Sequence, residues 1–212
     1  MVTKTHTNCL SRAHRFLLLV GLLSLAGTLR GAPSVPDGKG TASLPDNSTY
    51  VGEFKDGIFN GQGRLSWKNG AVYEGFFKDG LMQGHGVFSK GVFTKQDGDR
   101  YEGGFKNGLF EGQGVQSYSN GDTYKGDFID GRFCGRGVYT KKSGDRYEGE
   151  FRNNCFEGQG VLTYATGDVY KGAFKNNEFD GRGMLIYTNG MKSEGVWIQG
   201  RFTGEETTQK KP

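Results

Sequence analysis

The chain of 212 residues has few of the residues that build a thick aliphatic core or a covalent framework. It contains 3 cysteines and 4 prolines, and leucine, isoleucine and valine are scarce outside residues 16–29. No C-x-x-C pair is present and the histidines are scattered, so no metal site and no other cofactor is predicted. The few prolines and the lack of a three-residue glycine period exclude collagen.

Motifs for catalysis and phosphate binding are missing as well. No G-x-x-x-x-G-K-[ST] sequence occurs, and no helix pattern follows glycine-rich stretches such as 112–114. His85 has no serine, cysteine or aspartate at a matching spacing, and the recurrent Asp122, Asp145 and Asp168 adjoin turn glycines. We therefore predict that the chain is not an enzyme and has no catalytic residue.

An excess of one charge is absent from most of the chain. The formal net charge is +4, but four basic residues precede Asp37, the first acidic residue, so the remainder carries 23 charges of each sign. Nucleic-acid binding requires an excess of positive charge that neutralises phosphates, and this neutral part of the chain lacks it. No nucleic-acid partner is therefore predicted.

One long apolar run, residues 16–29, follows a basic start. It is shorter than the roughly 20 residues of a spanning helix, and residues 1–31 are predicted to be a helical signal peptide or signal anchor. The alternatives are a mitochondrial presequence and a mis-assigned start. A genuine leader implies the secretory pathway or a membrane; otherwise the chain is cytoplasmic or cytoskeletal. Asn47-Ser48-Thr49 is an N-glycosylation sequon, at Asn47.

Glycine and aromatic residues are abundant, with 38 glycines, 16 phenylalanines and 10 tyrosines, and they recur with a period. A tyrosine starts each copy, a glycine follows two residues later, an aromatic residue four residues later, and a G-x-G pair closes the copy. All steps between starts are 23 residues except the step of 28 residues from Tyr73 to Tyr101. The starting residues are Tyr50, Tyr73, Tyr101, Tyr124, Tyr147 and Tyr170, with Ser193 starting a partial seventh copy.

The pattern Y-x-G-x-F-x-x-G-x-x-x-G-x-G over residues 38–204 resembles the MORN (membrane occupation and recognition nexus) repeat family. The resemblance implies arrays of β-hairpins that serve in scaffolding, dimerisation and membrane-associated assembly, with a link to phosphoinositide binding. The domains expected are the leader (1–31), a linker with a degenerate half-repeat (32–49), the repeat array (50–204) and a polar tail (205–212).

The residues predict hairpins independently of the resemblance. Tyr, Gly and Phe at a spacing of two share one strand face, and Asp56-Gly57 and its equivalents are two-residue turn signals. Asn153-Asn154 and Asn176-Asn177 replace them in two copies, with φ > 0 expected at Asn154 and Asn177. The predicted fold is all-β: an elongated, single-layer antiparallel meander of tandem hairpins, with the N-terminal hydrophobic helix.

A two-residue loop also predicts the register. Phe54 then faces Phe59, Gly52 faces Gly61 and Tyr50 faces Gly63, with rings lying across glycines. Between repeats, segments such as Lys68-Asn69-Gly70 predict three-residue turns that end in a left-handed glycine. Cys134 and Cys155 fall on strands two apart, roughly 9.6 Å, which is too far for a disulfide.

The favoured function is a non-catalytic scaffold or adaptor that binds a protein partner or self-associates, near a membrane. A single-layer sheet leaves its aromatic face open, so the candidate partner-binding residues are Tyr124, Phe128, Phe133, Tyr147, Phe151 and Phe156. One alternative is a peripheral phosphoinositide or acidic-lipid binding module. Its candidate residues are basic pairs expected to face each other: Lys125 with Arg136, and Lys171 with Arg182. A further alternative is an accessory subunit of a phosphoinositide-pathway enzyme.

Overall fold

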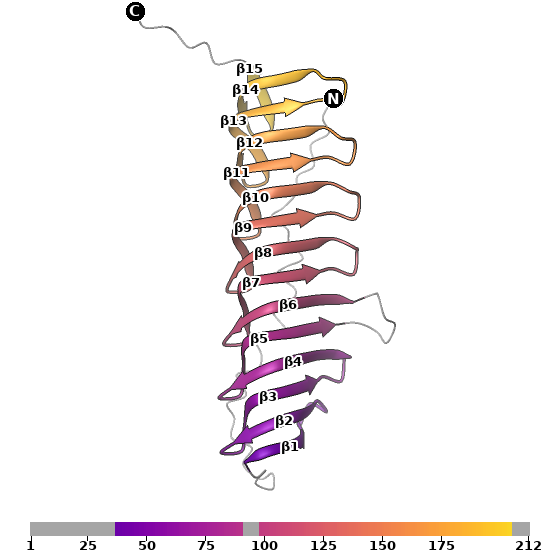
Figure 1. Ribbon diagram of the computed structural model, residues 1–212, viewed down its shortest axis with the longest axis vertical. Coiled ribbons are helices and arrows are strands. Elements are labelled where there is room, and N and C mark those ends of the chain that lie inside the picture. Colours follow the sequence, from indigo (N-terminus) through magenta and orange to yellow (C-terminus); the bar gives the residue numbers. More distant parts are fainter. Residues whose placement is uncertain (1–36, 91–97, 205–212) are drawn as a thin grey trace, which may run out of the picture. The chain divides into compact units, whose positions relative to one another are not determined.

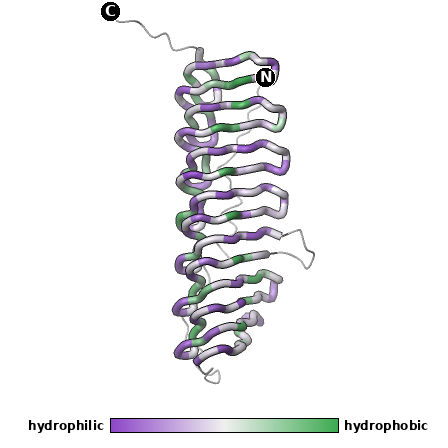
Figure 2. Tube along the Cα trace, viewed as in Figure 1, coloured by the Kyte–Doolittle hydropathy of each residue, from purple (hydrophilic) through white to green (hydrophobic). Residues whose placement is uncertain are grey.

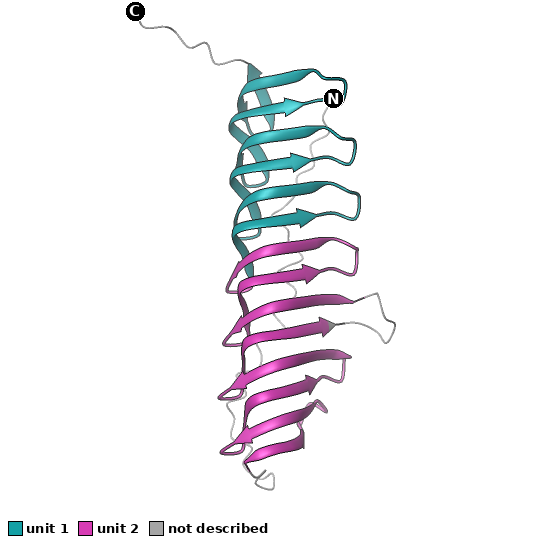
Figure 3. Ribbon diagram, in the orientation of Figure 1, with its two compact units in different colours: residues 1–11, 132–212 teal, residues 12–131 magenta. Residues whose placement is uncertain are grey.

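The computed structural model describes residues 37–90 and 98–204, which contain fifteen β-strands and no helix. The all-β part of the prediction is confirmed. The predicted leader helix, the polar tail and part of the insertion before Tyr101 lie outside the described residues. Those residues divide into two compact units, one ending at Gly131 and the other beginning at Arg132 (Figure 3).

Each unit is an antiparallel meander in which every strand pairs with the next one in the chain (Figure 1). The first unit contains β1 (Gly38–Ser43), β2 (Thr49–Lys55), β3 (Ile58–Ser66), β4 (Ala71–Lys78), β5 (Leu81–Lys90), β6 (Asp99–Lys106), β7 (Leu109–Ser117) and β8 (Thr123–Ile129). The second contains β9 (Arg132–Thr140), β10 (Arg146–Arg152), β11 (Cys155–Thr163), β12 (Val169–Lys175), β13 (Glu178–Ile186), β14 (Lys192–Ile198) and β15 (Arg201–Gly204).

The two-residue turns within the repeats, which we call tip turns, have the predicted left-handed backbone. Asp56 and Gly57 have φ of 52° and 73°. Asn154 and Asn177 have φ of 67° and 70°, and the asparagine before each is also positive. Positive φ at both central residues is the type I′ geometry, whose twist matches that of the flanking strands. The assignment of turns from Asp-Gly, Asn-Gly and Asn-Asn is therefore confirmed.

The turns between repeats, which we call return turns, also follow the prediction. In the turn at Lys68–Gly70, the N–H of Gly70 donates to the carbonyl of Trp67 at 3.0 Å, and Gly70 has φ of 82°. Asn69 Oδ1 accepts the N–H of Ala71 at 3.0 Å, which adds an Asx turn. This turn brings Tyr73 opposite Leu65.

The register within a hairpin is partly wrong in the prediction. Phe54 pairs with Phe59 as expected, but Gly52 pairs with Gly63 and Tyr50 with Leu65. A β-bulge between Gly52 and Phe54 causes the shift of two residues. The glycine inside the bulge of β3, Gly61, has φ of 85°, a conformation that favours glycine. Sequence spacing counts residues and does not reveal which of them leave the ladder.

The aromatic rings form a continuous core within each unit. Tyr50 stacks on Phe59 with ring centroids 3.8 Å apart, and the edges of Phe54 and Phe77 approach it at 5.1 Å each. Tyr147 stacks on Phe156 in the same way, at 3.8 Å. Along the strands hydrophobic and hydrophilic residues alternate without long apolar runs (Figure 2). Each repeat thus shares its rings with the next, which explains why the aromatic positions recur with the same spacing.

Candidate interaction surfaces

The six aromatic residues predicted to bind a partner are core residues. Five of them are at most 4% exposed, and Phe156, which stacks on Tyr147, is half-buried. The expectation of an open aromatic face is therefore wrong. The residues concerned are Tyr124, Phe128, Phe133, Tyr147, Phe151 and Phe156.

Two features bury the rings although each unit is one sheet. In five repeats the starting tyrosine lies directly over two paired glycines, so that a Cβ on Gly160 would come within 2.5 Å of the Tyr147 ring. The phenylalanine of the next repeat then covers the exposed edge, as Phe174 does at 4.9 Å from Tyr147. Aromatic rescue of glycine was predicted correctly. The additional cover comes from the bulge and from the following repeat.

The tyrosine hydroxyls stabilise the bulges. Tyr147 Oη donates to the carbonyl of Glu150 at 2.9 Å, and Tyr50 Oη donates to that of Glu53 at 2.9 Å. Glu53 lies between Gly52 and Phe54, the two residues where the strand register shifts. The Tyr50 hydroxyl therefore binds a backbone carbonyl in the part of the sheet where the bulge disrupts the ladder of hydrogen bonds. Burial raises the pKa of Tyr50 and of Tyr170 to about 12. These phenols are neutral donors at neutral pH.

The four basic candidate residues are exposed, and Lys171 and Arg182 do not pair as predicted. Lys171 lies opposite Met184, and Arg182 lies opposite Val196. The bulge again shifts the register by two residues and separates the like charges. Lys125 pairs with Val115 in β7, and Arg136 pairs with Glu150 in β10. Repulsion between facing cations is therefore no reason to expect a bound anion at Lys171.

The outward face of the second unit carries a regular row of side chains across its strands. The row alternates aliphatic with charged residues, and its charges alternate in sign. Glu148, Lys171 and Glu194 are exposed, and the aliphatic residues are half-buried. We call this the outer row; it consists of Val138, Glu148, Val161, Lys171, Met184 and Glu194.

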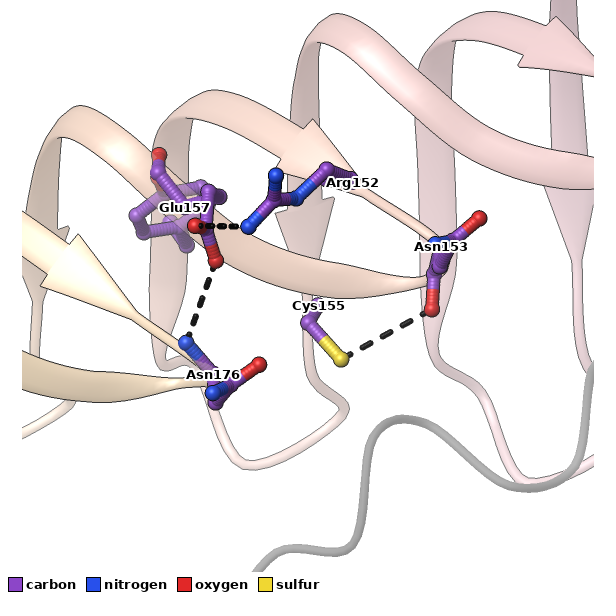
Figure 4. A network of polar contacts seen from close by, with 6 residues as sticks. Arg152, Asn153, Cys155, Glu157 and Asn176 are labelled. Atoms are coloured by element: carbon purple, nitrogen blue, oxygen red, sulfur yellow. Dashed lines mark hydrogen bonds and ion pairs between the residues drawn. The ribbon is translucent and has the colours of Figure 1, made fainter.

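Polar side chains link neighbouring repeats at several tip turns, and Figure 4 shows the link at Glu157. Glu157 accepts the backbone N–H of Asn176 at 3.2 Å and pairs with Arg152 at 2.6 Å. Asn154 Oδ1 accepts the buried N–H of Phe133 at 2.8 Å. The sequence predicted Asn154 and Asn176 as turn residues only. The recurrence of Glu, Asp or Gln before the G-x-G pair was the signal that could have indicated the link.

The remaining candidate positions are structural or isolated among the described residues. Cys134 is a free cysteine, as expected from its distance to Cys155, whose Sγ lies 3.6 Å from the Asn153 carbonyl. Across residues 37–90 and 98–204 no three potential metal ligands cluster. Within the same residues there is no helix with the length and hydropathy to cross a membrane. Asn47 is exposed in a turn, with φ of 63°.

These features define an all-β repeat protein in which similar hairpins share an aromatic core within each unit. The chain belongs to the MORN repeat family, whose model matches residues 50–72, 73–90, 101–123, 124–146, 147–169 and 170–192. No curated protein matches the chain.

Solved structures with some similarity include two from Drosophila melanogaster. The SAS-4 TCP domain in complex with a proline-rich motif of Ana2 has 14% identity and a TM-score of 0.40, covering 78% of this chain and 94% of its own. The TCP10c domain of Sas-4 has 12% identity and a TM-score of 0.35, and the match covers 74% of this chain and 85% of the Sas-4 chain. A streptogramin B lyase has 12% identity and a TM-score of 0.19, and the match covers 80% of this chain and 73% of the lyase chain.

Proposed function

We propose that this protein is a non-catalytic scaffold that binds a protein partner through the outer row. The observation that carries the proposal is the burial of the aromatic face, which leaves the polar face as the surface that another macromolecule meets. On that face the outer row repeats at every second strand, roughly 9.6 Å. A regular row of this kind suits an elongated partner segment with a matching repeat of side chains.

The chemistry of the outer row favours a protein over a membrane. Its charges are Glu148, Lys171 and Glu194, so the sign alternates and no basic cluster forms. Anionic membranes reward clusters of four to eight basic residues, which this row lacks. Charges of alternating sign, separated by aliphatic residues, can fix the register of a complementary protein surface and make its binding specific.

A charge swap tests the proposal. Lys171→Glu with Glu194→Lys keeps the net charge and composition but breaks the alternation of charge sign along the outer row. The tagged full chain should capture a defined set of proteins, and the swap should reduce their recovery at least tenfold in quantitative mass spectrometry. The matched control is Lys175→Glu with Glu178→Lys, a facing pair at the tip turn of the same hairpin. This control should bind like the native chain.

Binding to phosphoinositides or other acidic lipids is the second candidate, because Lys125, Arg136, Lys171 and Arg182 are all exposed. Sedimentation with vesicles that contain phosphoinositide distinguishes the two functions. Lipid binding should weaken when Lys125→Glu and Arg136→Glu are combined, and it should fall with salt. Two results together would favour lipid binding over the protein scaffold. They are salt-sensitive vesicle binding that depends on Lys125 and Arg136, and protein capture that the outer-row swap leaves unchanged.

The proposed place of action is near a membrane, and this depends on the leader. A fluorescent fusion of the full chain should reach the secretory pathway or a membrane, and a fusion without residues 1–31 should not. An identical cytoplasmic distribution of the two fusions would remove the membrane from the proposal and leave the scaffold.

A further inference from the structure

The outer row contains two opposite charges that do not neutralise each other. Among the described residues, neither Lys171 of β12 nor Glu194 of β14 forms an ion pair or a side-chain hydrogen bond. Glu148 differs, because Arg146 binds its carboxylate at 2.6 Å. Met184 of β13 lies between Lys171 and Glu194 and pairs with both. The two charges are therefore two strands apart, roughly 9.6 Å.

Side chains that donate hydrogen bonds flank the outer row along one side. Gln159 lies two residues before Val161 in β11, and Arg182 lies two residues before Met184 in β13. Residues two apart in a strand share a face, and both donors are exposed. Because β11 and β13 are also two strands apart, the donors repeat with the same period of roughly 9.6 Å as the charges.

This period matches one regular conformation of a partner chain better than the others. A polyproline II helix turns once in three residues, about 9.3 Å. An α-helix returns to the same face after seven residues, about 10.5 Å. A strand returns after two residues, about 6.7 Å. Over two periods of the outer row, polyproline II departs by about 0.6 Å and the α-helix by about 1.8 Å.

Hydrogen bonding and entropy favour the same conformation. Polyproline II has no internal hydrogen bonds, so its carbonyls are open to donors such as Gln159 and Arg182. The carbonyls of an α-helix already accept its own N–H groups. The aliphatic residues of the row are half-buried and offer little apolar area. A segment that folds on binding pays for its ordering, whereas polyproline II is preformed.

We propose that the outer row binds a polyproline II segment that crosses the strands and carries charges of alternating sign at every third residue. A basic residue of the segment meets Glu148, an acidic residue meets Lys171, and a basic residue meets Glu194. The intervening prolines pack against Val161 and Met184, and the two flanking donors bind the carbonyls of the segment. This inference rests on the proposed scaffold function and specifies the partner that the outer row recognises.

Fluorescence anisotropy with labelled peptides and the full chain tests the proposal. The matched peptide has the sequence Lys-Pro-Pro-Glu-Pro-Pro-Lys between short proline runs. Its control, Lys-Pro-Pro-Lys-Pro-Pro-Glu, has the same composition and net charge but no alternation of sign, and it is used with its reverse sequence. The native chain should bind the matched peptide at least tenfold more tightly than either control, and less tightly as salt increases. Equal binding of the peptides would overturn the proposal.

An alanine-rich helical peptide with the same three charges at every seventh residue tests the conformation. It should bind at least tenfold more weakly than the matched peptide. Tighter binding of the helical peptide would identify an α-helix as the occupant and overturn the proposal.

The outer-row swap gives the reciprocal test. After Lys171→Glu with Glu194→Lys the row contains two acidic residues followed by a basic one. The preference should therefore reverse, with a control peptide or its reverse binding at least tenfold more tightly than the matched peptide. Lys175→Glu with Glu178→Lys should keep the native preference, and circular dichroism verifies that both variants fold.

The two proposals can fail separately. If the swap removes the captured proteins but leaves the peptide preference of the native chain, polyproline II recognition by the outer row is wrong and the scaffold function stands. If the swap reverses the peptide preference but captured proteins are unaffected, the row binds polyproline II and the proposed scaffold function is wrong.

Discussion

At the scale of single residues, the starting tyrosine of each repeat has three roles. In the repeat of Tyr147 the ring covers two glycines, stacks on Phe156 and is flanked by further rings, while the hydroxyl donates to a bulge carbonyl. A hydrogen bond of this kind contributes about 1 kcal/mol, and an unsatisfied buried carbonyl costs somewhat more. The tyrosine therefore stabilises the bulge as well as the core.

Removal of one hydroxyl tests that role. Tyr147→Phe should lower the free energy of unfolding by about 1–2 kcal/mol, because the carbonyls of Glu150 and Glu157 lose their phenol donor. Urea unfolding followed by circular dichroism measures the change. Tyr187→Phe, at a half-buried ring, is the control and should stay within about 0.5 kcal/mol of the native chain. Equal losses in both variants would contradict the assignment.

The same hydroxyls predict a loss of stability in alkali. Burial raises the pKa of Tyr50 and Tyr170 to about 12, whereas an unfolded tyrosine ionises near pH 10. The neutral form is favoured in the folded state, so this contribution is complete below about pH 10 and is lost as the pH rises towards 12. The free energy of unfolding should fall over that range. Tyr170→Phe should show a shallower fall than the native chain.

Asn47 is a modification site predicted at the residue scale. It is exposed at a return turn, so an attached glycan would point away from the core. If the chain enters the secretory pathway, its electrophoretic mobility should rise after endoglycosidase treatment. Thr49→Val should abolish the shift and Thr49→Ser should retain it, since a hydroxyl is required there. A luminal chain without any shift would contradict the prediction.

At the scale of strands and turns, the acceptor before the G-x-G pair holds the next tip turn. Asp37, Gln83, Glu111, Glu157 and Asp180 each accept a backbone N–H of the following repeat. Cys134 occupies this place in its repeat, where a thiol is a weak acceptor. The Asn153 N–H is therefore the one tip-turn donor in its unit that lacks a carboxylate acceptor among the described residues.

This exception predicts a stabilising substitution. Cys134→Glu should supply the missing acceptor and raise the free energy of unfolding by about 0.5–1 kcal/mol, a modest gain because the site is partly solvated. Glu157→Ala should lower it by a similar amount. Thermal and urea unfolding of both variants provide the measurement. A destabilised Cys134→Glu chain would show that the thiol has a packing role at this position.

At the scale of the whole molecule, the repeats should unfold locally. Each repeat contacts its sequence neighbours, so stability is approximately a sum of repeat and nearest-neighbour contributions. Phe174 lies between Tyr147 and Tyr170 and contacts both rings. Its substitution therefore affects the two repeats on either side, while distant repeats keep their own contacts.

Hydrogen exchange of Phe174→Ala measures this locality. The substitution should cost about 3–5 kcal/mol, since a buried phenylalanine is removed. Protection should fall most in β10 to β13, which contain the rings that Phe174 contacts, and should be unchanged in β2 to β4. Tyr187→Phe again serves as the control. A uniform fall in protection across all described strands would show one cooperative unit instead of neighbour coupling.

Sequence alone determined the repeat, both turn types and the aromatic pairs next to the tip turns, such as Phe54 with Phe59. These features depend on local backbone preferences, of glycine and asparagine for positive φ, and on a period of two along a strand. A recurring pattern multiplies such local signals, which is why the family and the all-β fold could be predicted.

Only the tertiary structure decided which face meets solvent. The bulge moves Gly52 opposite Gly63, and this shift separates Lys171 from Arg182. Burial of Tyr147 and its equivalents then depends on rings from the following repeat, such as Phe174 for Tyr147. A bulge and a contact between repeats depend on the balance of ladder hydrogen bonds and packing over many residues, and no local pattern of the chain encodes that balance.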